Sequence, residues 1–212
     1  MNPCVGIERF AEEKRKRYLS ASELKRLGGA LREAEARNLI SPFSLAAIRL
    51  LLFTGARLSE ILTLRWTEVD QERACLQLRD SKTGAKTIHL SRAALEVLEN
   101  LPRTSGNPFV ICGQRDGSHL VNLQKAWRVV RELAGLGDLR LHDLRHSFAS
   151  IGVGEGLGLP LLGGLLAHTR PATTARYAHL ANDPLKTANE LIGTRLSELL
   201  GADPPSPAAT HS

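Results

Sequence analysis

Two basic side chains stand three residues apart in the segment LHDLRHSF, residues 141–148. On a helix this spacing projects His142 and Arg145 from one face, within about 6 Å of each other. Two cations at that distance repel each other unless an anion lies between them, so the pair favours an anion site. The alternative is a helix end at which His142 caps the helix and Arg145 is solvated. Asp143 would then be an acidic residue in the first turn, where the helix dipole stabilises it.

Three further segments carry side chains that could do related chemistry. TGARLSE places Glu60 three residues after Arg57, where it either orients the guanidinium or forms an ordinary surface ion pair. Lys82 lies at the expected tip of a hairpin, a usual position for an exposed lysine. In LAHTRPATTARYAHL eight residues separate His168 from Tyr177, and a tyrosine on such a helix is often a core residue. Each segment alone is weak evidence.

The elements that must position these residues form a mainly α fold with a small antiparallel β-sheet, of the α+β class. Helical spacing and capping residues predict helices over 19–36, 41–55, 56–66, 91–101 and 121–137, then from 142 to about 200 with breaks at Pro160, Pro171 and Pro184. Strands are predicted over 74–80 and 86–91, joined by a turn, with 108–112 as a candidate third strand.

The composition bounds the class of protein. The 212 residues include 28 Lys and Arg against 22 Asp and Glu, a formal net charge of +6, which favours contact with polyanions. The three cysteines lie far apart and show no disulfide or metal-binding pattern. The chain shows neither a membrane span nor a signal sequence, so we expect a cytoplasmic protein with no membrane partner.

We expect one domain over residues 20–201. Residues 1–19 read as a leader or the end of a linker, and 202–212 as a disordered, proline-rich tail.

In chain order, TGARLSE, SKTGAKTIHL, HDLRHSFAS and LAHTRPATTARYAHL resemble the signature segments of the tyrosine recombinase, or phage integrase, family over about residues 1–200. The resemblance implies the catalytic-domain fold of that family. It implies a site-specific recombinase or integrase that cleaves and rejoins DNA through a covalent 3′-phosphotyrosyl intermediate, without metal, ATP or cofactor. The implied partners are double-stranded DNA and further copies of the chain in a tetrameric synapse, with a monomer as the alternative for the free protein. Such a protein serves DNA integration by a mobile element and is associated with the nucleoid when bound.

Position by position, the resemblance implies six catalytic residues and one supporting residue. They are Arg57, Lys82, His142, Arg145, His168 and Tyr177, supported by Glu60. The two arginines would hold the scissile phosphate, where guanidinium groups stabilise the developing charge without a metal. His142 would accept the Tyr177 proton, directly or through water, and Lys82 would protonate the leaving 5′ oxygen. His168 would bind the phosphate and pack the helix that carries the tyrosine.

The chain departs from the family pattern in two places. The N-terminal core-binding domain is absent, so we expect an excised or naturally shortened catalytic domain with reduced DNA affinity. Ala167 stands where the family usually has glycine, and residues 152–164 hold six glycines, so this region is expected to be loosely held. The last helix carries an apolar face that packs either on a neighbouring protomer or on its own core.

Three other functions compete with this interpretation. A type IB topoisomerase uses a similar residue set and relaxes supercoils without a defined site. A DNA-binding regulator would use the basic face without catalysis. A metal-dependent phosphohydrolase built on the HD pair is less favoured, because no distal ligands complete a metal site.

Overall fold

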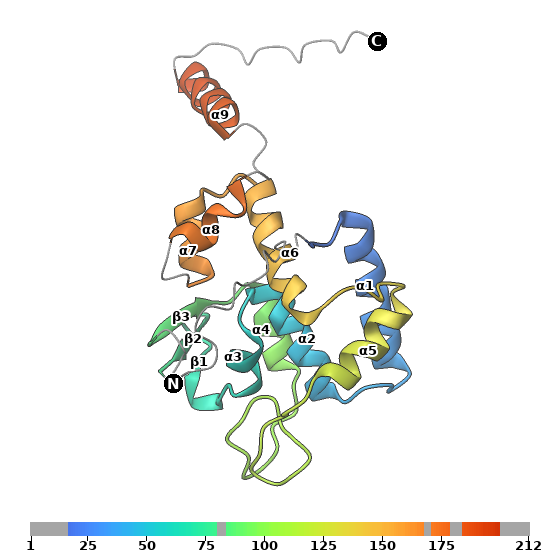
Figure 1. Ribbon diagram of the computed structural model, residues 1–212. Coiled ribbons are helices and arrows are strands. Elements are labelled where there is room, and N and C mark those ends of the chain that lie inside the picture. The colour runs from blue at the N-terminus through green and yellow to red at the C-terminus, as the bar shows by residue number, and fades with distance from the viewer. Residues whose placement is uncertain (1–16, 80–83, 168–170, 179–183, 200–212) are drawn as a thin grey trace, which may run out of the picture.

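The computed structural model describes residues 17–79, 84–167, 171–178 and 184–199, and shows a mainly helical body with a small sheet at one side (Figure 1). The helices are α1 (Ala21–Ala36), α2 (Pro42–Thr54), α3 (Leu58–Leu62), α4 (Arg92–Glu99), α5 (Gln124–Leu133), α6 (Leu141–Gly154), α7 (Leu159–Leu165), α8 (Pro171–Ala175) and α9 (Pro184–Leu199). The short 3₁₀ helix η1 (Trp66–Glu68) precedes the sheet. The predicted fold class is therefore confirmed.

Helix α2 lies at the centre of the main core because its sequence is apolar on nearly every side. Ser41 accepts a hydrogen bond from the Ser44 amide at 3.1 Å, and Pro42 occupies the first turn, so the helix begins where the sequence predicts. Gly55 ends it in the left-handed conformation at φ +61°. Helices α1, α4 and α6 pack against α2. The end of α2 lies beside α6, where Gly55 meets Arg145 and Phe148.

The sheet has the strand order β1-β2-β3 and is antiparallel throughout, with β1 (Val69–Asp70), β2 (Cys75–Leu78) and β3 (Lys86–His89). The prediction that 108–112 forms a third strand was wrong. The amide of Val110 donates to the Leu64 carbonyl at 2.8 Å, so this segment pairs with the chain that enters η1 and not with the sheet. The third strand is β1, whose two residues are too few to give a periodic sequence signal.

The C-terminal helices form a smaller core of their own. Prolines stand in the first turns of α7, α8 and α9, which confirms the predicted helix breaks. Buried residues of this second cluster come from α6, α7 and the turn after α8: they are Ala149, Val153, Leu162, Leu166 and Tyr177. Helix α6 contributes to both cores and connects them.

Helix α9 stands apart from the helical body in Figure 1. Its apolar side chains Leu191, Ile192, Leu196 and Leu199 are between 53% and 73% exposed. The sequence left open whether this apolar face packs on a neighbouring protomer or on its own core. These side chains do not pack on their own core. The expected tail, 202–212, and most of the expected leader lie outside the described residues. Among the described helices, none is both long and apolar enough to cross a membrane.

Candidate active site

Glu60 joins two cations at the start of α3. Its Oε1 accepts a hydrogen bond from Arg57 Nη1 at 2.9 Å, and its Oε2 accepts one from the Arg57 amide at 2.8 Å and lies 2.7 Å from Lys86 Nζ. The side chains of Glu60 and Lys86 are only 5% and 7% exposed. Burial acts to raise the pKa of Glu60, but hydrogen bonds from Lys86 and Arg57 outweigh burial and hold this pKa below its ordinary value. The ionised carboxylate therefore fixes the Arg57 guanidinium relative to β3.

Arg145, on α6, connects three separate elements and is only 5% exposed. Its Nη1 donates to the Gly55 carbonyl at the end of α2, and its Nη2 donates to the Leu166 carbonyl after α7 at 2.7 Å. Burial, and next the charge of Arg57, lower the pKa of Arg145. Burial also lowers the pKa of Lys86. Glu60 acts to raise this pKa, and the charges of Arg57 and Arg145 lower it further. These three cations are thus close enough to repel one another, which favours an anion beside them.

The Tyr177 hydroxyl lies 2.6 Å from Nδ1 of His146. The tyrosine is only 5% exposed because its ring belongs to the second core. Burial raises the pKa of Tyr177, while Arg176 and Arg145 act in the opposite direction. The guanidinium of Arg176 lies 5.8 Å from the ring centre. The phenol is therefore protonated at neutral pH and lies within the electrostatic reach of Arg145.

His142 lies one turn before His146 on α6, and the two rings meet edge to face with their centres 4.8 Å apart. Side chains packed around the imidazole ring remove part of its water and lower the pKa of His142, and the charge of Arg145 lowers this pKa further. The residue as a whole is nevertheless exposed at the surface. The neighbouring Asp143 accepts a hydrogen bond from the Arg140 amide at 2.8 Å and caps the helix. Asp143 therefore serves the start of α6, as the helix-dipole interpretation of this residue expects.

A cavity of about 380 Å³ opens beside this cluster. His142 and Arg145 line it together with Gln124, Arg131 and Arg140, and no acidic residue is found among its described lining residues. The Nε of Arg131 is buried and has no hydrogen-bond partner in the described part of the chain. The charged groups of the cavity are thus basic, its other walls are apolar at Leu51, Leu58 and Leu141, and it extends from Arg145 to α5.

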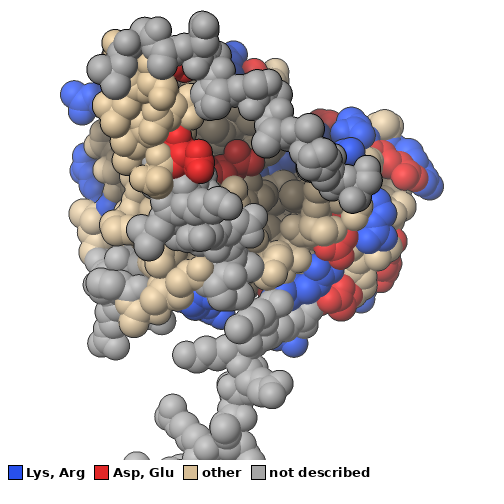
Figure 2. Space-filling model, turned by 90° about the horizontal axis from the view of Figure 1, so that it is seen from above, with Lys and Arg blue, Asp and Glu red and all other residues tan. Residues whose placement is uncertain are grey.

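Surface charge alone does not locate this site. Seen from above, the molecule is hollowed near its middle, acidic side chains lie beside the hollow, and basic side chains lie around the outer edge (Figure 2). The charges on this face are mixed. The convergence of Arg57, Arg145 and Tyr177 distinguishes the site better than net charge does.

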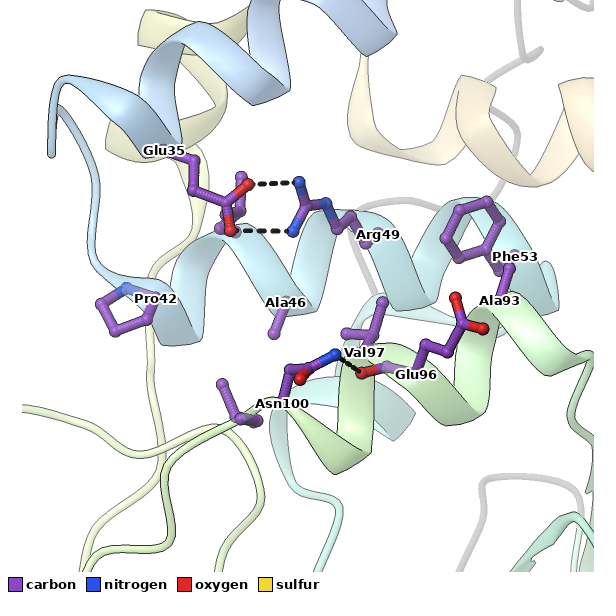
Figure 3. A pocket seen from close by; sticks show the side chains of 11 residues that line it. Glu35, Pro42, Ala46, Arg49, Phe53, Ala93, Glu96, Val97 and Asn100 are labelled. Carbon is purple, nitrogen blue, oxygen red and sulfur yellow. Dashed lines mark hydrogen bonds and ion pairs between the residues drawn. The ribbon is translucent and has the colours of Figure 1, made fainter.

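A second cavity, of about 350 Å³, lies between α1, α2 and α4 and does not contain such a cluster (Figure 3). Its carboxylate Glu35 binds Arg49 through two hydrogen bonds of 3.2 and 2.6 Å. The amide of Asn100 donates to the carbonyl of Glu96 at 2.9 Å. These polar groups satisfy one another, so the cavity offers no reactive arrangement. Within the described ranges, no three His, Cys, Asp or Glu side chains gather into a group that could hold a metal ion.

A sequence profile of the phage integrase family matches residues 17–183, which is most of the chain. The chain belongs to the phage integrase family. Tyrosine recombinase XerA of Pyrococcus furiosus is 29% identical over 191 residues, a match that covers 84% of this chain and 66% of the relative. Tyrosine recombinase XerD of Neisseria meningitidis serogroup B is 29% identical over 147 residues, or 65% of this chain and 50% of the relative. The chain thus spans between half and two thirds of these curated relatives.

The fold agrees with this membership of the phage integrase family. The catalytic domain of bacteriophage HP1 integrase superposes with a TM-score of 0.63 at 24% identity, and the match covers 83% of this chain and 95% of that domain. The predicted family and the predicted catalytic-domain fold are confirmed.

The integrase fold brings together five of the seven residues that the sequence singled out. Arg57, Glu60, His142, Arg145 and Tyr177 come from α3, α6 and the turn after α8 and lie around one site. The remaining two, Lys82 and His168, lie outside the described residues.

Two residues of this site were missed by the sequence interpretation. His146 stands directly after the Arg145 of the quoted HDLRH segment, but its partner Tyr177 is 31 residues away. The spacing of four residues from His142 is the only sequence signal that places His146 on the same helical face. Lys86 was counted as a strand residue, and no sequence pattern indicates its buried ion pair with Glu60.

Proposed function

We propose that this chain is the catalytic domain of a site-specific DNA recombinase in which Tyr177 attacks a DNA phosphodiester. The observation that carries the proposal is the buried Tyr177 hydroxyl within the electrostatic reach of Arg145, which in turn is influenced by Arg57. A phosphodiester is the anion that this arrangement fits, because attack adds negative charge to its non-bridging oxygens.

The arginine pair would hold the scissile phosphate. Two of the five N–H donors of Arg145 bind backbone carbonyls, which fixes the plane of its guanidinium, and the same residue lines the cavity beside the site. Glu60 keeps Arg57 in place. A fixed guanidinium loses little freedom when the transition state forms, which is the condition for strong electrostatic stabilisation.

In the proposed reaction the Tyr177 oxygen forms a bond to phosphorus while the bond from phosphorus to the 5′ oxygen breaks. The products are a 3′-phosphotyrosyl DNA and a free 5′ hydroxyl. Because the phosphodiester bond energy is kept in the intermediate, a second strand can be joined without ATP or metal. We assign protonation of the 5′ oxygen to Lys82 and a phosphate hydrogen bond to His168.

The proposed partners are double-stranded DNA and other copies of the same chain in a tetrameric synapse. The exposed apolar side chains of α9 support the second partner, because such a face is stabilised when another surface covers it. In the cell, we propose that the protein is found on the nucleoid when it is bound to DNA.

The first experiment identifies the DNA and tests the nucleophile together. The purified chain is incubated with fragmented genomic and phage DNA, and covalently retained fragments are sequenced. A suicide substrate with a nick beside the enriched site then traps the adduct. Tyr177→Phe should abolish adduct formation, and EDTA should leave the parent reaction unchanged. Equal trapping by Tyr177→Phe would refute the proposal.

The same experiment separates the two rival functions. A type IB topoisomerase would relax supercoiled plasmid and would show no enriched fragment. A DNA-binding regulator would shift the DNA in a native gel without any covalent product.

A further inference from the structure

We propose that His146, and not His142, accepts the proton of Tyr177 during strand cleavage; this inference rests on the proposed function. Nδ1 of His146 lies 2.6 Å from the Tyr177 oxygen, which is the distance of a direct hydrogen bond. No such bond joins His142 to Tyr177 in the described part of the chain. His142 instead contacts the ring of His146.

The tyrosine is held in this position by packing. Its ring is buried against Ala149, Val153, Leu162 and Leu166 in the second core. Because the ring is enclosed, this packing holds the hydroxyl beside His146. The hydrogen bond to His146 is therefore a consequence of the fold, and it aims the reacting atom at its proton acceptor.

The charges around His146 agree with a neutral imidazole before DNA binds. The described groups that act on it are His142, Asp143 and Arg145 from α6 and Arg176 from the turn after α8. Burial, and next His142 and Arg176, lower the pKa of His146 to about 4, against the opposite effect of Asp143. At neutral pH the phenol therefore donates its hydrogen to Nδ1, and the imidazole carries its own hydrogen on Nε2.

DNA binding would make this histidine a better base. A phosphodiester beside Arg145 brings a negative charge that offsets the arginines, so protonation of His146 becomes more favourable. In the step itself, the phenol O–H bond breaks and the proton moves to Nδ1 while the oxygen bonds to phosphorus. The 5′ oxygen leaves and takes its proton from the general acid. On rejoining, a 5′ hydroxyl attacks phosphorus and gives its proton to the group that acted as general acid. The bond from phosphorus to the tyrosine oxygen breaks, and His146 returns its proton to that oxygen.

The test measures single-turnover cleavage of the suicide substrate by the full chain. His146→Gln keeps a polar side chain that does not take a proton at neutral pH, and should lower the rate by about 100-fold, the usual contribution of a general base. The parent rate should rise with pH through the pKa of the DNA-bound imidazole and then level off. The rate of His146→Gln should instead keep rising until the phenol itself ionises. His89→Gln, an exposed histidine on β3, is the matched control and should behave as the parent.

A second measurement separates proton transfer from positioning. Trifluorotyrosine at position 177 ionises more readily than tyrosine, so it needs a base less. The chain has only two tyrosines, and residue-specific incorporation in a Tyr18→Phe background therefore labels one site. The loss caused by His146→Gln should fall below about 10-fold with this nucleophile, whereas the loss caused by His142→Gln should remain. In the chain with His146 intact, the same nucleophile should weaken the acid limb of the pH profile.

Three results would overturn the inference. In the first, His146→Gln has the same pH profile as the parent. In the second, trifluorotyrosine restores the rate of His142→Gln and not that of His146→Gln. In the third, trifluorotyrosine leaves the acid limb of the pH profile unchanged in the chain with intact His146. If Tyr177→Phe abolishes the adduct in the same assay, any of these results contradicts only the role given to His146 and leaves the proposed function standing. An adduct that persists in Tyr177→Phe contradicts the proposed function.

Discussion

At the scale of single residues, the site depends on a few side chains that each hold two partners. Glu60 holds Arg57 and Lys86, and Arg145 holds the carbonyls of Gly55 and Leu166. A surface ion pair contributes little to stability, but Glu60 and Lys86 are almost fully buried, so the loss of one partner leaves an uncompensated charge. The ion pair of Lys86 with Glu60 is consequently a structural part of the site.

Glu60→Gln should lower the free energy of unfolding by about 3 kcal/mol at neutral pH, because it leaves Lys86 buried without its carboxylate. The pKa of Glu60 is lower in the folded chain than in the unfolded chain. Its stabilisation is therefore complete above the unfolded pKa and is lost as the pH falls through the folded pKa. Denaturant unfolding of both proteins between pH 7 and pH 3 should show the difference shrinking on acidification.

Glu35→Gln is the matched control, because Glu35 also binds an arginine but its side chain is 52% exposed. Its effect at neutral pH should stay below about 1 kcal/mol. Equal losses in the two variants would contradict the role given to burial at Glu60.

Gly55→Ala should disturb both the backbone and Arg145. Gly55 has φ +61°, and a Cβ there would lie 2.7 Å from a ring carbon of Phe148. Strain and overlap together should cost about 3 kcal/mol, measured by thermal unfolding, and should lower the cleavage rate because the Gly55 carbonyl binds Arg145. Gly106→Ala has φ +76° with open space around it and should cost only about 1 kcal/mol. Similar losses at both glycines would show that the contact with Phe148 is unimportant.

The sequence identified most residues of the site but not their connections. Arg57, Glu60, Arg145 and Tyr177 stand in segments whose order along the chain resembles a known family. The hydrogen bond from Tyr177 to His146 depends on how the turn after α8 lies against α6, and no local pattern reports that packing. The base was therefore expected at His142, one turn away from His146, which contacts Tyr177.

At the scale of elements, the turn after α7 carries a strained residue. Ala167 has φ +48°, a conformation that favours glycine, and it stands where the sequence comparison with the family expects glycine. The carbonyl of the preceding Leu166 accepts from Arg145, so the turn is tied to the site. The departure from the family pattern at Ala167 thus introduces backbone strain next to the residue that binds Arg145.

Ala167→Gly should raise the free energy of unfolding by about 1 kcal/mol, because it relieves the left-handed strain at some cost in unfolded-chain entropy. Thermal unfolding measures the change. Ala126→Gly, within helix α5, is the control and should lower stability by about 1 kcal/mol, since glycine is unfavourable in a helix. A loss of stability at position 167 would show that its backbone does not favour glycine.

Helix α9 should act in assembly and not in cleavage. Leu196→Glu places a charge on the exposed apolar face, which should reduce pairing of two DNA-bound complexes in native gels by at least about 10-fold while single-site cleavage stays within about twofold. Thr194→Glu adds the same charge on the opposite side of the helix and should leave pairing intact. Parent-like pairing by Leu196→Glu would exclude this face as the contact between protomers.

The sequence predicts the helices better than the strands for a simple reason. Caps, prolines and apolar spacing repeat over several turns in α1, α2 and α5, whereas β1 has two residues and no period. The apolar run at 108–112 has the composition of a strand, but its partner is the chain around Leu64. Strand pairing is a long-range contact, which a local pattern does not contain.

At the scale of the whole molecule, the net charge of +6 is spread over 212 residues, and one face carries charges of both signs (Figure 2). The local arrangement of charged side chains therefore matters more for DNA binding than the net charge does. The cavity beside the arginine pair holds Arg131 and Arg140 with no acidic residue among its described lining. If DNA lies across this cavity, each phosphate contact releases counterions and makes binding depend more steeply on salt.

Arg140→Gln should reduce the slope of log K against log salt for binding to duplex DNA by about 1, the effect of losing a single phosphate contact. Arg140 is exposed, so the change should leave thermal stability nearly unaltered. Arg92→Gln is the matched control, because Arg92 lies on α4 and pairs there with Glu96 and Glu99. It removes the same charge and should leave the slope unchanged, since its guanidinium is already bound to carboxylates away from the cavity. Equal slopes for both variants would mean that net charge alone governs binding, and that DNA does not cross the cavity beside Arg145.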